Sequence, residues 1–226
     1  ASGHKFGESC IGTGWIVWRQ RENLSDHVAI SVSYLGGMGE SYNLNFSRPA
    51  SGIYVQYYKF LRYGISGYQK ICEHMMTHAQ KIREGLKKMR FEGKPRFIIL
   101  DDGDKNCLPV VTAMLNPECN FEYDDIDLQH AISEHNWYVS AYKMNFEDPI
   151  TKQDKPIFTD QDGSKTMFRI VVKSNINSVM ADNLIDSFGK TLEMLDSIEF
   201  KNKANGALKG MHRKKNLFSK HLCHVC

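Results

Sequence analysis

The sequence has no apolar run close to the roughly 20 residues that a membrane-spanning helix needs. The run Trp15-Ile16-Val17-Trp18 is followed at once by Arg19-Gln20-Arg21 and predicts a buried strand instead. The six cysteines form no compact disulfide framework, and the first residues lack the charged and apolar regions of a signal peptide. We therefore expect a protein of the reducing cytoplasm that contacts no membrane.

A strong charge of one sign is also missing. The net charge of +3 is too small to indicate a nucleic-acid partner. With 42% hydrophobic and 24% charged residues over 226 positions, the composition is that of a globular protein with one large domain or two modest ones. The chain has no initiating methionine and starts with glycines around a His-Lys pair, so we expect a partial chain.

Long helices are predicted in the first half of the chain, over about 50–63 and 68–89, with Gly64 and Gly67 at the joint between them. Arg48-Pro49 should end extended pairing just before the first helix. The second helix carries an apolar stripe at spacings of three and four that must be buried: Ile71, Met75, Ala79, Ile82, Leu86 and Met89.

Shorter elements are expected on either side of these helices. Segments 10–19 and 28–34 are rich in small and β-favouring residues and predict strands. Beyond Gly93-Lys94-Pro95, short strands and helices predict a small α/β domain with a mixed or antiparallel sheet. There the expected strands cover 96–100, 108–114, 137–139 and 167–172, and the helices cover 125–136 and 184–195.

A Gly-His-Lys near a chain end is by itself most often an exposed loop, but the surrounding motifs change this interpretation. Together they resemble the cofactor-lysine region of glutamate decarboxylases, members of the group II pyridoxal-phosphate-dependent decarboxylases. The similarity is strong to about residue 90, weakens between about 91 and 165, and then returns. It is carried by Ala1-Ser2-Gly3-His4-Lys5-Phe6-Gly7, Gly12-Thr13-Gly14-Trp15, Tyr34-Leu35-Gly36-Gly37, Asn45-Phe46-Ser47-Arg48-Pro49-Ala50, Gln56-Tyr57-Tyr58-Lys59-Phe60-Leu61-Arg62, Gly67-Tyr68 and Phe168-Arg169-Ile170.

The resemblance implies an α/β protein that holds the later part of a fold-type I pyridoxal-phosphate enzyme. Residues 1–93 would be the C-terminal part of the large cofactor-binding domain, including the long helices. Residues 94–200 would be the small C-terminal α/β domain. Residues 201–226 contain no acidic side chain and would be a basic, flexible tail.

The resemblance also assigns roles to five residues. Lys5 would be catalytic and would hold pyridoxal 5'-phosphate as a Schiff base, with His4 beside the cofactor phosphate. Ser47 would donate to the phosphate of the neighbouring subunit, which implies a homodimer or higher homo-oligomer. Arg169 would face a substrate carboxylate, and Tyr34 could protonate the carbanionic intermediate.

The expected reaction is decarboxylation of L-glutamate to 4-aminobutanoate and carbon dioxide, performed as part of a longer or complemented enzyme. The main specificity residues of the family precede the lysine, so another amino acid stays an alternative substrate. A non-catalytic fragment or interaction subunit is a further alternative.

Two histidine-containing groups suggest metal binding only weakly, and no metal site is expected. His74 and His78 lie one helical turn apart, but no third ligand is indicated, so we expect them on the surface. A terminal cluster lacks a paired knuckle; it comprises His221, Cys223, His224 and Cys226. The basic tail could bind an acidic protein such as calmodulin, but a solvated tail is the simpler expectation.

Overall fold

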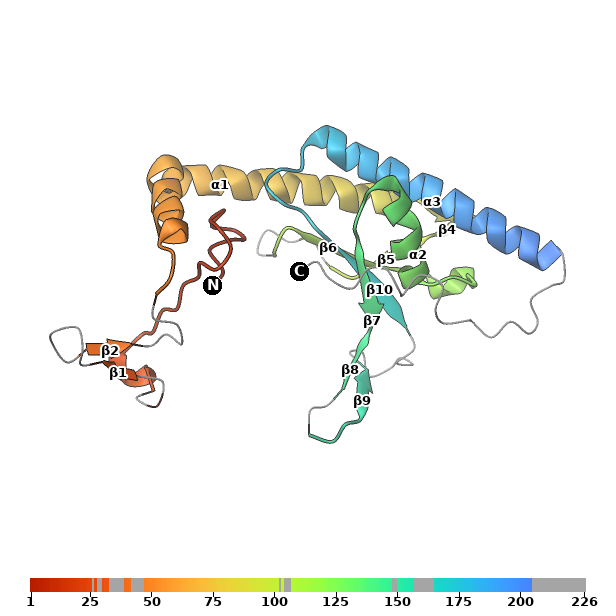
Figure 1. Cartoon of the computed structure of the whole chain (residues 1–226). Helices are drawn as coiled ribbons and strands as arrows, with labels where there is room; N and C mark the ends of the chain where they lie inside the picture. Colours follow the sequence, from red (N-terminus) through yellow and green to blue (C-terminus); the bar gives the residue numbers. More distant parts are fainter. Residues whose placement is uncertain are drawn as a thin grey trace. The chain divides into compact units, whose positions relative to one another are not determined.

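The computed structural model describes residues 1–25, 27, 30–32, 39–41, 47–101, 103, 107–147, 150–156 and 165–204. These residues form two compact units, Ala1–Ile71 and Cys72–Cys226, and the division falls inside one long helix. Figure 1 shows the helices and the antiparallel strands in sequence colours. The expected domain boundary near residue 93 stays a prediction.

The first unit contains a short 3-10 helix, η1 (Arg21–Asn23), and two strands, β1 (Ile30–Val32) and β2 (Gly39–Ser41), which pair antiparallel. The first half of helix α1 (Ser51–Lys88) completes it. Gly64 has non-helical dihedral angles, φ 57° and ψ −169°, so α1 is two helices joined at a kink. The prediction of two helices joined there is confirmed.

The expected strand over 10–19 is wrong for the described structure. Only one isolated bridge forms, between Ser2 and Gly14, and residues 15–19 form no regular strand. The run Trp15-Ile16-Val17-Trp18 is open to solvent, with Val17 87% exposed, whereas burial was expected. A strand that is apolar on both faces needs neighbouring elements on both faces. In the described first unit, the Trp15 ring lies 5.9 Å from that of Phe60, but Ile16 is still 73% exposed.

The second unit is built on a four-stranded antiparallel sheet in the order β5-β6-β10-β7, so an antiparallel sheet is confirmed. The strand expected at 137–139 is displaced, because the residues that pair with the sheet are Ser140–Lys143. The sheet strands are β5 (Phe97–Ile99), β6 (Val110–Leu115), β7 (Ser140–Lys143) and β10 (Thr166–Val171). Two hairpins flank it: β3 (Arg90–Phe91) with β4 (Lys94–Pro95), and β8 (Asn145–Glu147) with β9 (Asp154–Pro156).

Helix α2 (Asp125–Ile132) contacts β7, β10 and helix α3 (Ser178–Ala204), and α3 also lies against the second half of α1. Short 3-10 helices, η3 (Pro117–Cys119) and η4 (Ser133–His135), lie before and after α2. Helix α3 continues four residues into the segment expected to be a tail. The remainder of that tail, including its Cys and His cluster, lies outside the described residues.

Three phenylalanines join the sheet to α3. Phe168 is fully buried, its ring 5.4 Å from that of Phe97 and 5.5 Å from that of Phe188. The apolar stripe predicted on α1 is largely buried, from Met75 to Leu86. A Cβ on Gly85 of α1 would lie 2.6 Å from the Ile185 side chain, so this glycine lets α1 and α3 approach closely.

A buried ion pair ties α1 to the segment before β6. Arg83 is 1% exposed, and its Nε donates to Asp101 Oδ1 at 2.7 Å. The other carboxylate oxygen, Oδ2, accepts from the backbone N–H of Thr112 at 2.6 Å. Breaking such a pair leaves an uncompensated charge, so the two residues are needed together.

A second buried carboxyl joins α2 to the sheet. Asp125 is 2% exposed, its Oδ1 accepts from Leu115 N at 2.9 Å, and its Oδ2 accepts from the Thr166 hydroxyl at 2.8 Å. Burial raises the pKa of Asp125 to about 7, although both hydrogen bonds favour the ionised form. This side chain therefore titrates close to neutral pH.

Candidate active site

The predicted cofactor lysine lies on a short turn whose base is closed by backbone hydrogen bonds. Gly3 N donates to Thr13 O at 2.8 Å, and Ser9 N donates to Gly3 O at 2.9 Å. Within the turn, Glu8 N donates to Lys5 O at 3.0 Å. The exposed side chains of Lys5 and its neighbour His4 project from this closed loop.

The first half of α1 holds the same turn from one side. Gln56 Nε2 donates to Gly7 O at 2.9 Å, and the Tyr68 hydroxyl donates to the same oxygen at 3.2 Å. Burial raises the pKa of Tyr68 above its usual value, in keeping with a neutral hydroxyl that donates to Gly7 O. Neither Gln56 nor Tyr68 was given a role from the sequence, although both lie in motifs that carry the resemblance.

Polar contacts fasten the end of the turn to the helix as well. The Ser9 hydroxyl donates to Gly52 O at 2.5 Å, and Lys59 Nζ lies 3.4 Å from Glu8 Oε2. A Cβ on Gly52 would overlap the Thr13 side chain, so glycine is required where the helix starts. These contacts fix the backbone that carries Lys5 while leaving its side chain open.

The three other predicted site residues belong to segments of the chain away from the turn that carries Lys5. Ser47 is exposed just ahead of α1, in the same unit as His4 and Lys5. Tyr34 lies outside the described residues. Arg169 belongs to the second unit, so its place in one site with Lys5 stays a prediction.

Arg169 is exposed in the middle of β10, where its backbone pairs with Thr112 of β6 and Ser140 of β7. Side chains alternate along a strand, and its neighbours Phe168 and Ile170 are buried on the other face. Arg169 therefore projects from the sheet face opposite the phenylalanine core. It is an open, charged fork that can receive a carboxylate.

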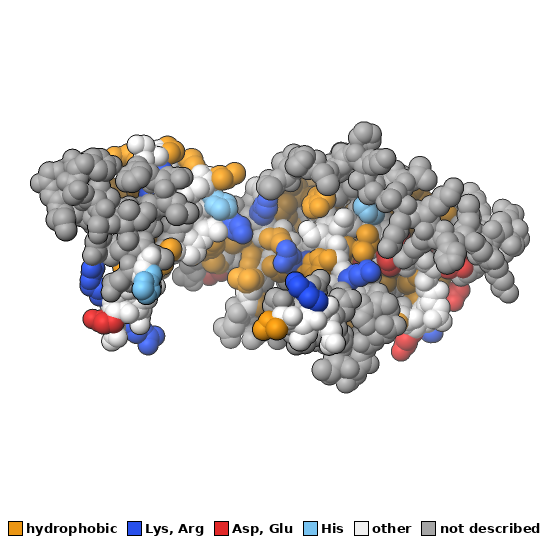
Figure 2. All heavy atoms as spheres, turned by 60° about the horizontal axis from the view of Figure 1, so that its bottom comes forward, with side chains coloured by type: hydrophobic (Ala, Val, Ile, Leu, Met, Phe, Trp, Pro, Cys, Tyr) orange, Lys and Arg blue, Asp and Glu red, His pale blue; other side chains and the backbone are white. Residues whose placement is uncertain are grey.

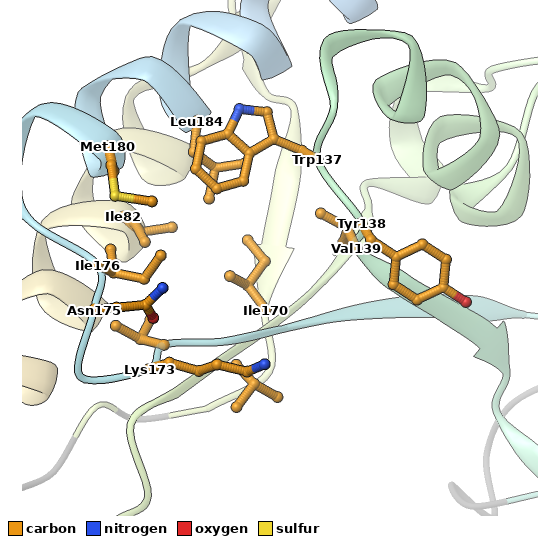
Figure 3. A pocket seen from close by; sticks show the side chains of 12 residues that line it. Ile82, Trp137, Tyr138, Val139, Ile170, Lys173, Asn175, Ile176, Met180 and Leu184 are labelled. Atoms are coloured by element: carbon orange, nitrogen blue, oxygen red, sulfur yellow. The ribbon is translucent and has the colours of Figure 1, made fainter. Parts of the chain in front are cut away.

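A hollow of about 280 Å3 lies in the second unit and contains none of the predicted site residues. In Figure 3, Ile82, Met180, Leu184 and Trp137 gather around it, while the Tyr138 ring points away. The lining is mainly apolar, with Lys173 at one side. The hollow offers no cluster of titratable groups for acid or base chemistry.

The paired histidines are less exposed than expected, which corrects the surface assignment. His78 is 9% exposed, and its Nδ1 lies 2.7 Å from His74 O. His74 Nε2 lies 2.7 Å from Ile176 O. Each ring thus has a backbone carbonyl as a hydrogen-bond partner, and no group of three or more potential metal ligands occurs among the described residues.

Several apolar side chains of the first unit are open to solvent. The exposed part of α1 includes Ile53, Tyr54, Tyr57 and Leu61, each more than half exposed. On the face shown in Figure 2, hydrophobic side chains lie at the surface beside lysines and arginines. No helix within the described part of the chain is long and apolar enough to cross a membrane.

The chain belongs to the pyridoxal-dependent decarboxylase family, whose conserved domain matches residues 1–124. The curated relatives include glutamate decarboxylases. The one from Petunia hybrida is 29% identical over 197 residues, which cover 87% of this chain and 35% of the relative. The one from Aliivibrio fischeri is 34% identical over 185 residues, which cover 82% and 36%.

The fold comparison agrees with the family. Lactobacillus brevis glutamate decarboxylase matches with a TM-score of 0.68 and 31% identity over 86% of this chain and 40% of that chain. A Burkholderia pseudomallei sphingosine-1-phosphate lyase shares the fold, with a TM-score of 0.57 at 14% identity over 93% of this chain and 41% of that chain. The α/β class and the fold-type I assignment are confirmed. The chain spans 35% to 41% of the length of these relatives.

Proposed function

We propose that the protein carrying this sequence decarboxylates L-glutamate to 4-aminobutanoate and carbon dioxide with pyridoxal 5'-phosphate as cofactor. The observation that carries the proposal is Lys5, exposed on a turn fixed by backbone bonds at the start of the family match. The relatives named glutamate decarboxylase support glutamate as the substrate.

The side chains present suit the cofactor. Lys5 supplies the primary amine that a covalent link to an aldehyde needs. His4 beside it and the Ser47 hydroxyl are hydrogen-bond donors that suit a phosphate. The fixed turn orients the amine, and proper orientation of reacting groups lowers the barrier.

Pyridoxal phosphate, when bound, supplies the electron sink for breaking the bond to the α-carboxylate. Arg169 would bind a substrate carboxylate through its planar guanidinium. Tyr34 would deliver a proton from its hydroxyl to the substrate Cα after carbon dioxide has left. Lys5 Nζ would hold the cofactor between turnovers.

We also propose a homodimer or higher homo-oligomer in the cytoplasm. Ser47 as a donor to the neighbouring subunit's phosphate is the basis for a shared site. The exposed apolar side chains Ile53, Tyr54 and Tyr57, close after Ser47, are consistent with a subunit contact there. The described cysteines are free thiols, as in a reducing compartment.

The test is release of carbon dioxide from carboxyl-labelled glutamate by the complete protein that carries this sequence. Lys5→Ala should abolish turnover, because the covalent attachment of the cofactor is lost. Lys70→Ala, at an exposed position on α1, is the matched control and should keep wild-type activity. Faster turnover of aspartate or an aromatic amino acid would contradict the substrate assignment.

A further inference from the structure

The first half of α1 buries an amide and exposes its apolar side chains, the reverse of an ordinary surface helix. Gln56 is 1% exposed, whereas its neighbours Ile53, Tyr54 and Tyr57 are 60% to 72% exposed. Between Ser51 and Tyr63, only Gln56 and Gly52 are buried. A buried polar side chain on such a helix needs a specific reason, because its burial is costly.

The Gln56 amide contacts both ends of the loop that carries Lys5. Its Nε2 donates to Gly7 O at 2.9 Å and to the Tyr68 hydroxyl at 3.4 Å. Its Oε1 is buried and has no hydrogen-bond partner in the described part of the chain. A Cβ on Gly3 would lie 2.8 Å from this oxygen, and a Cβ on Gly7 would overlap it.

The two glycines bracket His4-Lys5-Phe6, so the amide fills the space that their missing side chains leave. An amide that binds one glycine carbonyl and packs against both glycines restricts the whole loop between them. Tyr68 reinforces the arrangement, because its hydroxyl donates to Gly7 O and its ring lies 5.3 Å from that of Phe6.

We propose that Gln56 is a positioning residue for Lys5, whose buried amide sets the direction in which the turn presents the lysine to the cofactor. This inference rests on the proposed function. Gln56 touches neither substrate nor cofactor and acts through the backbone of the turn. A displacement of about 1 Å at the reacting groups can cost about a hundredfold in rate, so loss of this support should affect turnover.

The experiment compares Gln56→Met, which removes the amide at similar volume, with the wild type and with Gln80→Met. Gln80 is exposed on the same helix, and its amide contacts Arg83 and Glu84 of the second unit, so Gln80→Met makes the same chemical change away from the turn. Tyr68→Phe removes only the second donor to Gly7 O. It is the replacement variant if Gln56→Met fails to fold. Each protein is loaded with pyridoxal phosphate and checked by circular dichroism.

Three readouts follow for each variant: the pH midpoint of the visible absorbance of the lysine-bound cofactor, the extent of borohydride-fixed label on Lys5, and kcat with KM for glutamate. Gln56→Met should shift the midpoint and lower kcat about tenfold to a hundredfold with KM within about twofold. Tyr68→Phe should act in the same direction by about fivefold, and Gln80→Met should match the wild type.

The outcomes separate this inference from the proposed function. A wild type that carries no label on Lys5 would overturn the proposed function, and the inference with it. A labelled wild type alongside a folded Gln56→Met with unchanged midpoint, label and kcat would overturn the inference alone. If Gln56→Met does not fold, an unchanged Tyr68→Phe overturns it in the same way.

Discussion

Replacing Asp125 by asparagine should remove a pH dependence of stability from the second unit. The carboxyl is buried between α2 and the sheet, and burial raises its pKa from 3.8 to about 7. A raised folded pKa means that the folded state prefers the neutral acid. The stabilisation is therefore fully present below about pH 4 and is lost as the pH rises through 7.

The structure sets the size of this effect. A shift of about three pKa units corresponds to about 4 kcal/mol between the fully protonated and fully ionised limits. Between pH 5 and 8 the wild type should lose about 2.5 kcal/mol from this group alone. Asparagine keeps an acceptor for Leu115 N and carries no charge, so the Asp125→Asn variant should not share this loss.

The assay is urea unfolding of both proteins at pH 5 and pH 8. The quantity of interest is the wild-type minus variant free energy of unfolding, because titration of the other groups cancels in this difference. Hydrogen exchange of the Leu115 amide, which donates to Asp125, reports the same change locally. A difference that is independent of pH, or one that grows in favour of the wild type at pH 8, would refute the reasoning.

Two further predictions concern the packing of the second unit. Phe168→Ala should lower the free energy of unfolding by about 3 to 5 kcal/mol, because it empties a fully buried site between the Phe97 and Phe188 rings. Chemical denaturation measures this loss, and a value below about 1 kcal/mol would contradict the assigned core. Arg83→Met should cost about 3 kcal/mol by leaving Asp101 without its ion-pair partner. Adding Asp101→Asn, which removes the charge and keeps an acceptor for Thr112 N, should recover part of that loss in the same assay. Equal losses in the single and double variants would argue against the pairing.

Local signals predicted much of the fold. The joint in α1 followed from Gly64, since a backbone with φ of 57° favours glycine. Strands β5, β6 and β10 followed from short runs of β-favouring residues. The end of the second helix followed from Gly93, which with Glu92 forms a two-residue turn with φ values of 82° and 49°.

Contacts between distant parts of the chain could not be predicted in the same way. The apolar character of Trp15-Ile16-Val17-Trp18 predicts burial, but burial depends on which other elements cover it. The strand expected at 137–139 begins instead at Ser140, because register is decided by pairing with β10. The role of Gln56 depends on a carbonyl 49 positions away, which no local pattern reveals.

The candidate site was predicted by resemblance more than by pattern. Lys5 and His4 are exposed on a fixed turn, an arrangement that the local Gly-His-Lys pattern alone cannot distinguish from an ordinary loop. The motifs around them selected the functional interpretation. Arg169 was also assigned by resemblance, because an exposed arginine on a strand has no evident role until the site to which it belongs is known.

Peptide mapping after borohydride reduction tests the central claim most directly. The complete protein that carries this sequence is incubated with pyridoxal phosphate, reduced, digested and analysed by mass spectrometry. We predict one stoichiometric phosphopyridoxyl adduct, on the peptide that contains Lys5, which disappears in Lys5→Ala. An unmodified Lys5 peptide, or stoichiometric label on another lysine, would contradict the account.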